Sequence, residues 1–418
     1  MRAQAPAGTP VRLGPETLVS NNTDGGWLRC EPAVAASGDT VVVTWNDSYG
    51  GSHGSPTGVA IAWGLSRDRG KTFSFGGYLP RLEDASVPSG ADSIVIADRH
   101  ERFLLLVLSW QKDVQTLFLY EMQVERPGKW TLLSRFSTAG NKLSLIDRPY
   151  MYIDARGQPW ITFTTIVDGE QQIAVIRSRN RGQTWEGPVI ASDGPGSKLP
   201  SRVITHGQTV TVVWVQSSNA STDLRQAVSQ DDGKTFSQPT RLAVGKPPST
   251  ISGYVMGVSQ QARALYTPNL EIQASSQRSE VAVVMDYPAE KSYEVVQGVL
   301  PSGRLQPIFP EYAASFFPAV GEATYGSAIL AYCRRSDSPV TDVCLSVPAR
   351  DGRRTVLTLN STSTDWSKTP GDHDTAPVQR NFGDYISITA TKTYLIAVWT
   401  DGRSGAPRIF SRVIEIHS

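Results

Sequence analysis

A hairpin pattern that recurs along the whole chain constrains its fold more than any other feature. Seven segments consist of an apolar strand, a short polar turn and a second apolar strand with an aromatic residue at its end. These second strands end at Trp45, Trp110, Phe163, Trp214, Tyr266, Tyr332 and Trp399, so successive ends lie 51 to 67 residues apart. Helical periodicity is almost absent, and Gly and Pro separate short β-branched and aromatic runs. The chain is therefore predicted to be all-β, with one sheet per repeat.

A four-stranded meander repeated around a ring predicts a β-propeller. Each sheet has two apolar faces, and radial stacking covers both of them. We predict seven blades; six is the main alternative, and eight is also open because the second and fifth repeats are degenerate. The last repeat supplies only three strands before Ser418, so the N-terminal stretch 11–20 is expected to pair as its fourth strand and close the ring. Residues 1–418 then form one domain, with residues 1–10 flexible.

The charge balance excludes several classes of partner. The chain has 40 Lys and Arg against 39 Asp and Glu, with a formal net charge of +1. Such a balance gives no attraction to nucleic acid or to anionic lipid, and no apolar run is long enough to span a membrane. The N-terminal "AQA" fits the start of a mature secreted chain with a new Met, and an ordinary disordered cytosolic terminus is the alternative. We therefore expect a secreted or periplasmic protein.

The three cysteines suggest an oxidising environment rather than a metal site. Cys333 and Cys344 flank a polar segment between two apolar runs, so we predict that they face each other on a hairpin and form a disulfide. Two buried free thiols are the alternative. Cys30 is expected to be buried and inert. No His/Cys cluster has zinc-ligand spacing, and no cofactor is predicted. The sequence leaves open whether an ion occupies the central channel and which oligomer forms.

Three octapeptides repeat one motif: "SRDRGKTF" at 66–73, "SRNRGQTW" at 178–185 and "SQDDGKTF" at 229–236. They resemble the Asp-box of the sialidase (BNR-repeat) superfamily, Ser-x-Asp-x-Gly-x-Thr-Trp/Phe, with Asn180 in place of Asp. Polar side chains around a Gly can bond the amides of their own turn. We expect Asp68, Asn180 and Asp231 to fasten the corner between the third and fourth strands. The resemblance implies that these corners lie opposite the substrate site.

The loops on the other face are therefore predicted to hold the site, and they are rich in Arg. The resemblance to sialidases implies arginines that grip a sugar carboxylate in bidentate fashion. It also implies a Tyr nucleophile helped by a Glu, and an Asp as acid/base. The family's first Arg lies in an Arg-Ile-Pro motif, whereas "LRCEP" places Arg29 one residue out of step, with Glu31 before Pro32. The candidate catalytic residues are Asp47, His53 and Tyr385, and the candidate substrate-binding residues are Arg29, Arg148, Arg202, Arg334 and Trp27.

Each candidate also has a structural interpretation. Arg148 is placed to form an ion pair with Asp147, and Asp47 to cap a turn. His53 lies in a glycine-rich loop, where it is either an acid/base near neutral pH or an exposed loop residue. Arg334 either grips an anion or solvates the tip of a hairpin, and Tyr385 either reacts or forms a corner.

The sequence favours a secreted, sialidase-like carbohydrate-active enzyme, a glycoside hydrolase that acts on an acidic terminal sugar of a glycan. One alternative is a non-catalytic glycan-binding or protein-interaction propeller, with Trp27 among its stacking platforms. A further alternative is a polysaccharide lyase or rhamnosidase-like enzyme that uses His53. The expected ligand is a glycan or an oligosaccharide.

Overall fold

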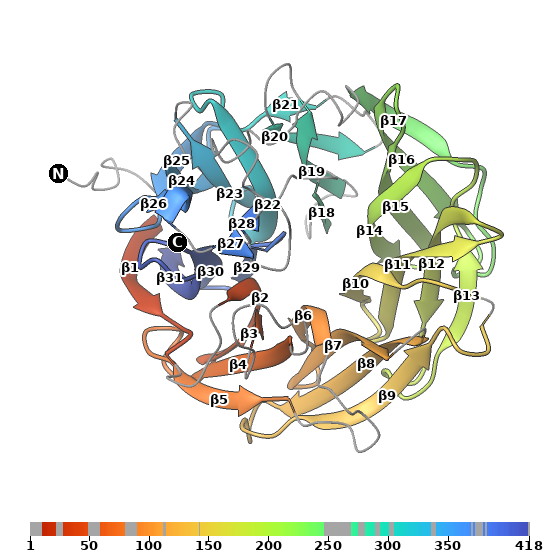
Figure 1. Ribbon diagram of the computed structural model, residues 1–418, viewed down its shortest axis with the longest axis horizontal. Coiled ribbons are helices and arrows are strands. Elements are labelled where there is room, and N and C mark those ends of the chain that lie inside the picture. The colour runs from red at the N-terminus through yellow and green to blue at the C-terminus, as the bar shows by residue number, and fades with distance from the viewer. Residues whose placement is uncertain are drawn as a thin grey trace.

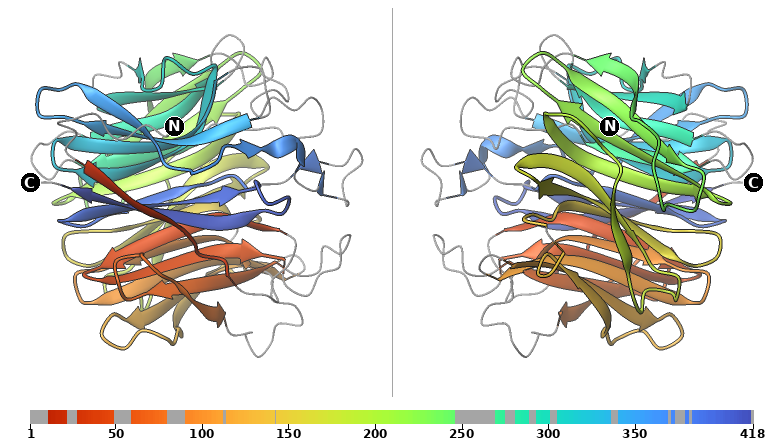
Figure 2. Two further views of the ribbon diagram at one scale, coloured as in Figure 1. Left: turned by 90° about the vertical axis from the view of Figure 1, so that its left-hand side faces the viewer. Right: turned by 90° about the vertical axis from the view of Figure 1, so that its right-hand side faces the viewer.

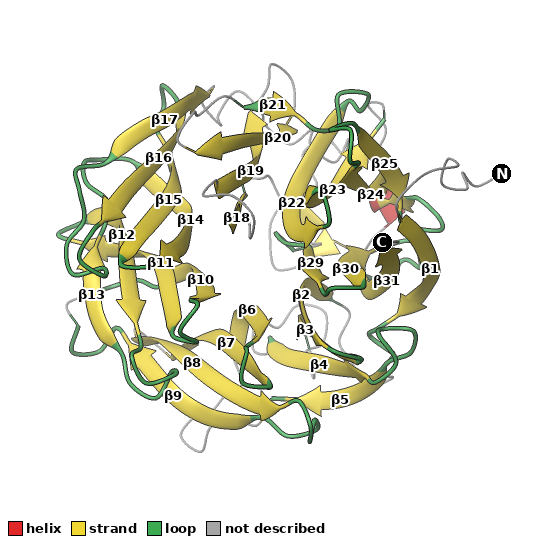
Figure 3. Cartoon of the chain, turned by 180° about the vertical axis from the view of Figure 1, so that it is seen from behind, coloured by secondary structure: helices red, strands yellow, loops and turns green. Residues whose placement is uncertain are grey.

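Seven sheets stand around a central axis like the blades of a propeller (Figure 1). This computed structural model describes residues 11–21, 28–48, 59–79, 90–111, 114–141, 143–245, 269–274, 281–288, 293–300, 305–335, 340–368, 371–372, 379–380 and 383–416. Seen from behind, the described chain is mainly strand, with loops and turns joining the strands (Figure 3). The prediction of a seven-bladed propeller is confirmed.

The first four sheets follow each other in chain order, each with its strands in sequence order from the axis outwards. They are β2–β5 (Arg29–Ser37, Thr40–Asp47, Ala60–Ser66, Ser74–Tyr78), β6–β9 (Gly90–Ala97, Arg102–Gln111, Val114–Gln123, Thr131–Ser137), β10–β13 (Asp147–Ile153, Pro159–Val167, Glu170–Arg177, Glu186–Ile190) and β14–β17 (Ser197–His206, Thr209–Ser217, Thr222–Ser229, Thr240–Gly245). We number these sheets 1 to 4.

Sheets 5 and 6 continue the ring. They are β18–β21 (Leu270–Ala274, Val281–Pro288, Tyr293–Leu300, Gln306–Pro307) and β22–β25 (Ala314–Ala323, Gly326–Arg334, Val340–Pro348, Arg354–Thr358), with β26 (Thr364–Asp365) paired to β24. A short 3₁₀ helix η2 (Trp366–Lys368) and the pair β27–β28 (Gly371–Asp372, Gln379–Arg380) follow. They project from the face opposite the end of β31, which Figure 2 shows from both sides.

The ring closes through both ends of the chain. Sheet 7 contains β29 (Ser387–Ala390), β30 (Tyr394–Asp401) and β31 (Arg408–Ile416), and β1 (Val11–Leu18) pairs antiparallel with β31. An ion-pair group reinforces this joint, because Arg403 binds both Glu16 of β1 and Asp401 of β30. The prediction that the N-terminal strand closes the last blade is confirmed.

Apolar side chains hold the blades together. Within the described residues, the buried apolar side chains fall into seven clusters, one between each pair of neighbouring sheets. Second strands such as "TVVVTWND" are buried on both faces, because a neighbouring sheet covers each side. This explains the continuous rather than alternating apolar runs in the sequence. Among the described residues, no helix has the length and apolarity needed to cross a membrane.

Each octapeptide forms the corner between the third and fourth strands of its sheet. In the first, the backbone N–H and the hydroxyl of Thr72 donate to the carboxylate of Asp68, at 2.9 and 2.6 Å. The N–H of Gly70 donates to Ser66 Oγ at 2.8 Å. Asn180 and Asp231 make matching contacts in the second and third corners. These side chains satisfy the amides of their own turns.

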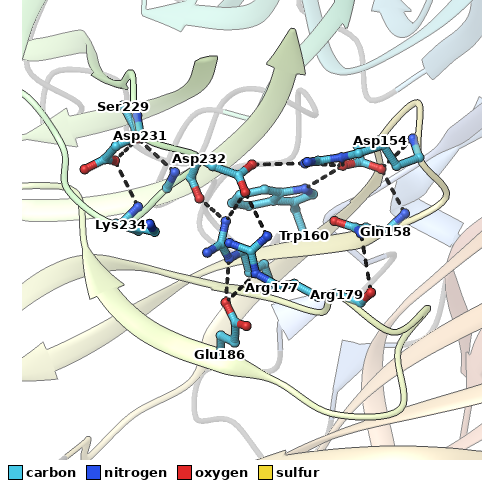
Figure 4. A network of polar contacts seen from close by, with 12 residues as sticks. Asp154, Gln158, Trp160, Arg177, Arg179, Glu186, Ser229, Asp231, Asp232 and Lys234 are labelled. Carbon is cyan, nitrogen blue, oxygen red and sulfur yellow. Dashed lines mark hydrogen bonds and ion pairs between the residues drawn. The ribbon is translucent and has the colours of Figure 1, made fainter. Parts of the chain in front are cut away.

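The third corner also ties sheet 4 to sheet 3 through ion pairs (Figure 4). Asp232 contacts Arg177 at 2.7 Å and Arg179 at 3.1 Å, and both arginines contact Glu186. Arg177 also stacks over the ring of Trp160. This network lies on the rim that carries the octapeptides, so it braces the ring.

One expectation is wrong, and another falls outside the described residues. Cys333 and Cys344 are free, buried thiols; the register places Cys344 opposite Ala331 rather than opposite Cys333, so the predicted face-to-face disulfide is wrong. The fifth predicted hairpin, residues 254–266, lies outside the described residues. Sheet 5 is instead built from later strands that begin at Leu270.

Candidate active site

A cavity of about 740 Å³ opens around the axis where the first strands of the sheets begin. Sheets 1 to 4 and sheet 7 contribute to its wall. Its ionisable side chains among the described residues are Glu31, Asp92, Asp147, Arg148, Asp384 and Tyr385. A smaller chamber of about 140 Å³ shares four of these residues and also contains Arg202 and Glu271. The two cavities together form a funnel on the face opposite the octapeptides.

A repeated β-bulge directs side chains into this funnel. In sheets 1, 2 and 3 the first strand shifts its register by one residue, at Glu31-Pro32, Asp92-Ser93 and Arg148-Pro149. The first residue of each bulge has a positive φ of 55°, 52° and 44°. Such a backbone conformation is unfavourable for any residue other than Gly, and backbone strain of this kind concentrates at functional sites. In each of these three sheets, the bulge directs one acidic or basic side chain towards the axis.

Tyr385 and Asp92 form the central pair of the site. The phenol of Tyr385 donates a hydrogen bond to Asp92 Oδ1 at 3.3 Å, across sheets 7 and 2. Burial and the nearby carboxylate of Asp147 raise the pKa of Asp92 to about 6. Burial also raises the pKa of Tyr385 well above its usual value, while Arg148 acts in the opposite direction. The pair therefore places a phenol beside a carboxyl group that can accept its proton.

Arg148 covers this pair. Its guanidinium lies 5.2 Å from the centre of the Tyr385 ring and contacts Asp384 Oδ2 at 2.9 Å. Its other terminal nitrogen donates to Asn269 Oδ1 at 2.8 Å. Burial alone would lower the pKa of Arg148, but the neighbouring phenol and carboxylates raise it. Arg148 is thus a permanent cation beside the phenol.

Glu31 supports the segment that carries Tyr385. One of its carboxylate oxygens accepts the backbone N–H of Asp384 at 3.1 Å, and the other accepts the amide of Asn46 at 2.6 Å. Gly383 packs directly against Glu31, and a Cβ at Gly383 would lie 2.6 Å from Glu31 Cγ. The position of Tyr385 therefore depends on contacts between sheets 7 and 1.

The other nominated arginines are paired with protein carboxylates. Arg202 contacts Glu271 through Nη2 at 2.6 Å and Nε at 3.2 Å, and its guanidinium stacks on Tyr150 in the smaller chamber. Arg29 binds Asp47 at 3.1 Å, and both side chains are buried. Contrary to prediction, neither Arg29 nor Asp47 lines the cavity, because Glu31 takes the bulge position that faces the axis.

The remaining predictions have mixed outcomes. Arg148 and Tyr385 both line the main cavity. Arg334 is buried in β23 and does not contribute to the wall of either chamber. His53 and Trp27 lie outside the described residues. Arg148 pairs with Asp384 rather than with Asp147.

Sequence reasoning missed Asp92 and Asp147 as site residues. Aligning the first strands of the repeats would have revealed Asp92, because "CEPAV", "ADSIV" and "DRPYM" place Glu31, Asp92 and Arg148 in register. The Pro after the bulge residue is present in the first and third of these segments and is replaced by Ser93 in the second. No group of three or more His, Cys, Asp or Glu side chains in the described part of the chain is arranged to hold a metal ion.

No protein-family model and no curated protein sequence matches this chain. Its fold is similar to that of a sialidase from Trypanosoma rangeli in complex with the inhibitor DANA, with a TM-score of 0.50 and 12% identity. That match covers 96% of this chain and 57% of the sialidase, so this chain spans little more than half of that protein.

Two fungal enzymes are also similar. An α-L-arabinofuranosidase mutant from Fusarium graminearum, in complex with an iminosugar inhibitor, matches with a TM-score of 0.45 and 13% identity, over 96% of this chain and 98% of that one. An α-L-arabinanase from Penicillium chrysogenum, complexed with arabinobiose, matches with a TM-score of 0.49 and 11% identity, over 97% and 99%. At 12% identity, the match to the sialidase shows a shared propeller fold.

Proposed function

We propose that this protein is a glycoside hydrolase that takes the terminal sugar of a glycan into the main cavity. The observation that carries the proposal is the hydrogen bond from Tyr385 to Asp92 beneath the guanidinium of Arg148. A Tyr can act as a glycosidase nucleophile when a neighbouring carboxylate accepts its proton. The sialidase-like propeller fold supports the same class of chemistry, although a fold alone does not fix an activity.

The proposed reaction has two steps. Tyr385 Oη gives its proton to Asp92 and bonds to the anomeric carbon, while the bond from that carbon to the glycosidic oxygen breaks. A cavity carboxylic acid, for which Asp147 is the candidate, gives the leaving alcohol its proton. Water then attacks the anomeric carbon and passes a proton to that carboxylate. Tyr385 leaves and recovers its own proton from Asp92.

Each residue has a stated role in this scheme. Arg148 stabilises the negative charge that develops on the phenol, because a fixed cation in a buried site acts strongly on nearby charge. Glu31 holds the backbone at Asp384 and thereby positions Tyr385. A second scheme follows from the raised pKa of Asp92. In that scheme protonated Asp92 serves as the acid and Asp147 as the nucleophile, since retaining hydrolysis can use one carboxylic acid and one carboxylate.

The test is a turnover screen with aryl glycosides, followed by covalent trapping. The wild-type protein is incubated with a fluorinated, activated glycoside of the best substrate, and the labelled peptide is identified by mass spectrometry. A label on Tyr385 supports the first scheme, and a label on Asp147 supports the second. Tyr385→Phe and Asp92→Asn should each lower kcat at least about a hundredfold. Saturable sugar binding without any turnover would instead support the non-catalytic propeller.

A further inference from the structure

The arginines of this site are already held by the protein's own carboxylates. Resting on the proposed function, we infer that the cavity selects a terminal sugar without a carboxylate, and that a neutral glycosyl unit rather than an acidic one is its substrate. This departs from the expectation that arginines grip an acidic sugar. Three features of the described residues support it: the contacts of Arg148, the contacts of Arg202 and the charge of the cavity wall.

The first feature is a clamp that joins three blades. Arg148 of sheet 3 contacts Asp384, which leads into sheet 7, at 2.9 Å. Asn269, which leads into sheet 5, accepts from Arg148 at 2.8 Å and donates to the carbonyl of Asp384 at 3.1 Å. Arg148 and Asp384 are only 12% and 14% exposed. A sugar carboxylate would therefore have to compete with Asp384 and Asn269 for the two terminal nitrogens of Arg148, and taking the place of Asp384 would break this clamp.

The second feature is the position of Arg202. Its Nε and Nη2 both contact Glu271, and its Nη1 donates to the backbone carbonyl of Ser201 at 2.8 Å. All three guanidinium nitrogens are therefore engaged. Arg202 also lines the smaller chamber and not the main one. It is not placed to complete a multi-arginine grip on a sugar in the main cavity.

The third feature is the charge of the cavity wall. Among the described residues that line the main cavity, four carboxylic side chains, Glu31, Asp92, Asp147 and Asp384, accompany one guanidinium, that of Arg148. A sugar carboxylate placed among these carboxylic side chains would be repelled. Sugar hydroxyls, in contrast, can donate hydrogen bonds to carboxylate oxygens. The wall therefore suits a ligand that is rich in hydroxyl groups and uncharged.

The experiment compares substrates that differ only in a carboxylate. Aryl β-glucoside is paired with aryl β-glucuronide, and aryl α-galactoside with aryl α-galacturonide; an aryl α-L-arabinofuranoside and an aryl sialoside complete the set. We expect kcat/KM for the neutral member of the accepted pair to exceed that of its uronide more than about tenfold. A preference for a uronide or for the sialoside would overturn the inference.

A variant tests the cause of the preference. Asp384→Asn removes the carboxylate that holds Arg148, so the neutral-to-uronide ratio should fall by at least about fivefold. Asp39→Asn is the matched control, because Asp39 pairs with Arg69 on the exposed rim opposite the cavity. It should leave the ratio unchanged. Equal ratios in wild type and Asp384→Asn, with both proteins folded by circular dichroism, would contradict the inference.

Binding separates this inference from the proposed hydrolysis. If no glycoside is turned over, saturation-transfer NMR with methyl glucoside, methyl glucuronide, methyl galactoside and methyl galacturonide reports the preference of the cavity directly. Saturable binding of a neutral glycoside over its uronide supports the inference although the hydrolase proposal has failed. Binding of a uronide over its neutral partner, or binding of none of the four, overturns it.

Discussion

Arg29 Nε and Asp47 Oδ2 lie 3.1 Å apart across β2 and β3, and the two side chains are 1% and 0% exposed. Trp45 Nε1 lies 3.3 Å from the same carboxylate oxygen. This pair therefore belongs to the packing of sheet 1 and not to the wall of the cavity. It occupies the place where sequence reasoning expected a substrate contact and a catalytic acid.

Asp47→Asn is expected to destabilise the fold strongly. The substitution removes the carboxylate charge that faces the buried guanidinium of Arg29, and breaking one side of a buried ion pair costs about 3–5 kcal/mol. Urea unfolding monitored by tryptophan fluorescence measures this loss. Asp39→Asn breaks an exposed pair with Arg69 and should change stability by less than about 1 kcal/mol. Loss of turnover in Asp47→Asn at unchanged stability would return Asp47 to the catalytic residues.

The pH dependence of turnover should report on Asp92. In the Tyr385 scheme Asp92 must be ionised to accept the phenol proton, and its pKa is raised to about 6. We therefore expect kcat/KM to fall as the pH drops below about 6. A fall above about 6 would favour the scheme in which Asp92 is the acid. A pH–rate profile from 4 to 9 on the best glycoside decides between them, with stability checked at each pH.

The raised pKa of Asp92 should also make the stability of the fold depend on pH. Its folded pKa of about 6 lies above its ordinary value of 3.8. The folded state thus binds this proton more tightly, and the associated stability is present below pH 4 and lost as the pH rises through 6. Asp92→Asn should therefore be more stable than wild type at pH 8 by about 1–3 kcal/mol and equal to it at pH 4. Denaturant unfolding at both pH values measures the difference; a uniform effect at both would contradict it.

The ring could be predicted from the sequence because its signals are local. Buried strands, turns and strand-end aromatics repeat at blade length, and stretch 11–20 had no hairpin partner of its own. That stretch indeed pairs with β31, from Val11 opposite Ile416 to Leu18 opposite Phe410. The hairpin predicted at 254–266 lies outside the described residues, and the described strands of sheet 5 begin at Leu270.

The site could be predicted only in part. Tyr385 and Arg148 were nominated because loop position and residue type agreed, and both line the main cavity. Asp92 was missed because its partners lie in sheets 3 and 7, and distance along the chain hides such contacts. Arg29 was misassigned because the bulge turns Glu31, and not Arg29, towards the axis. A bulge depends on the pairing register, which one strand's sequence does not show.

The octapeptide corners should tolerate Asn but not Ala. Burial raises the pKa of Asp68, but hydrogen bonds from Ser66 and Thr72 lower it overall, so the corner is strongest with an ionised carboxylate. Asn180 already contacts the same two groups of Thr184 in the second corner: its Oδ1 accepts the backbone N–H, and its Nδ2 donates to the hydroxyl. We expect Asp68→Ala to lose about 1–2 kcal/mol of stability and Asp68→Asn distinctly less. Thermal unfolding of both variants tests this; equal losses would show that the side-chain contacts do not fasten the turn.

Gly383→Ala should impair the site more than the fold. Gly383 has a φ of +80°, and an added Cβ would lie 2.6 Å from Glu31 Cγ and 2.9 Å from both Glu31 N and Cys30 Cβ. Relief of these contacts requires Glu31 to move, and Glu31 anchors the backbone beside Tyr385. Gly405→Ala is the matched control, because Gly405 has a φ of +87° with open space around its Cβ position. Both variants should lose about 1 kcal/mol from backbone strain. Only Gly383→Ala should lower kcat, by at least about tenfold, and equal kcat values would show that Tyr385 does not depend on the contact between Gly383 and Glu31.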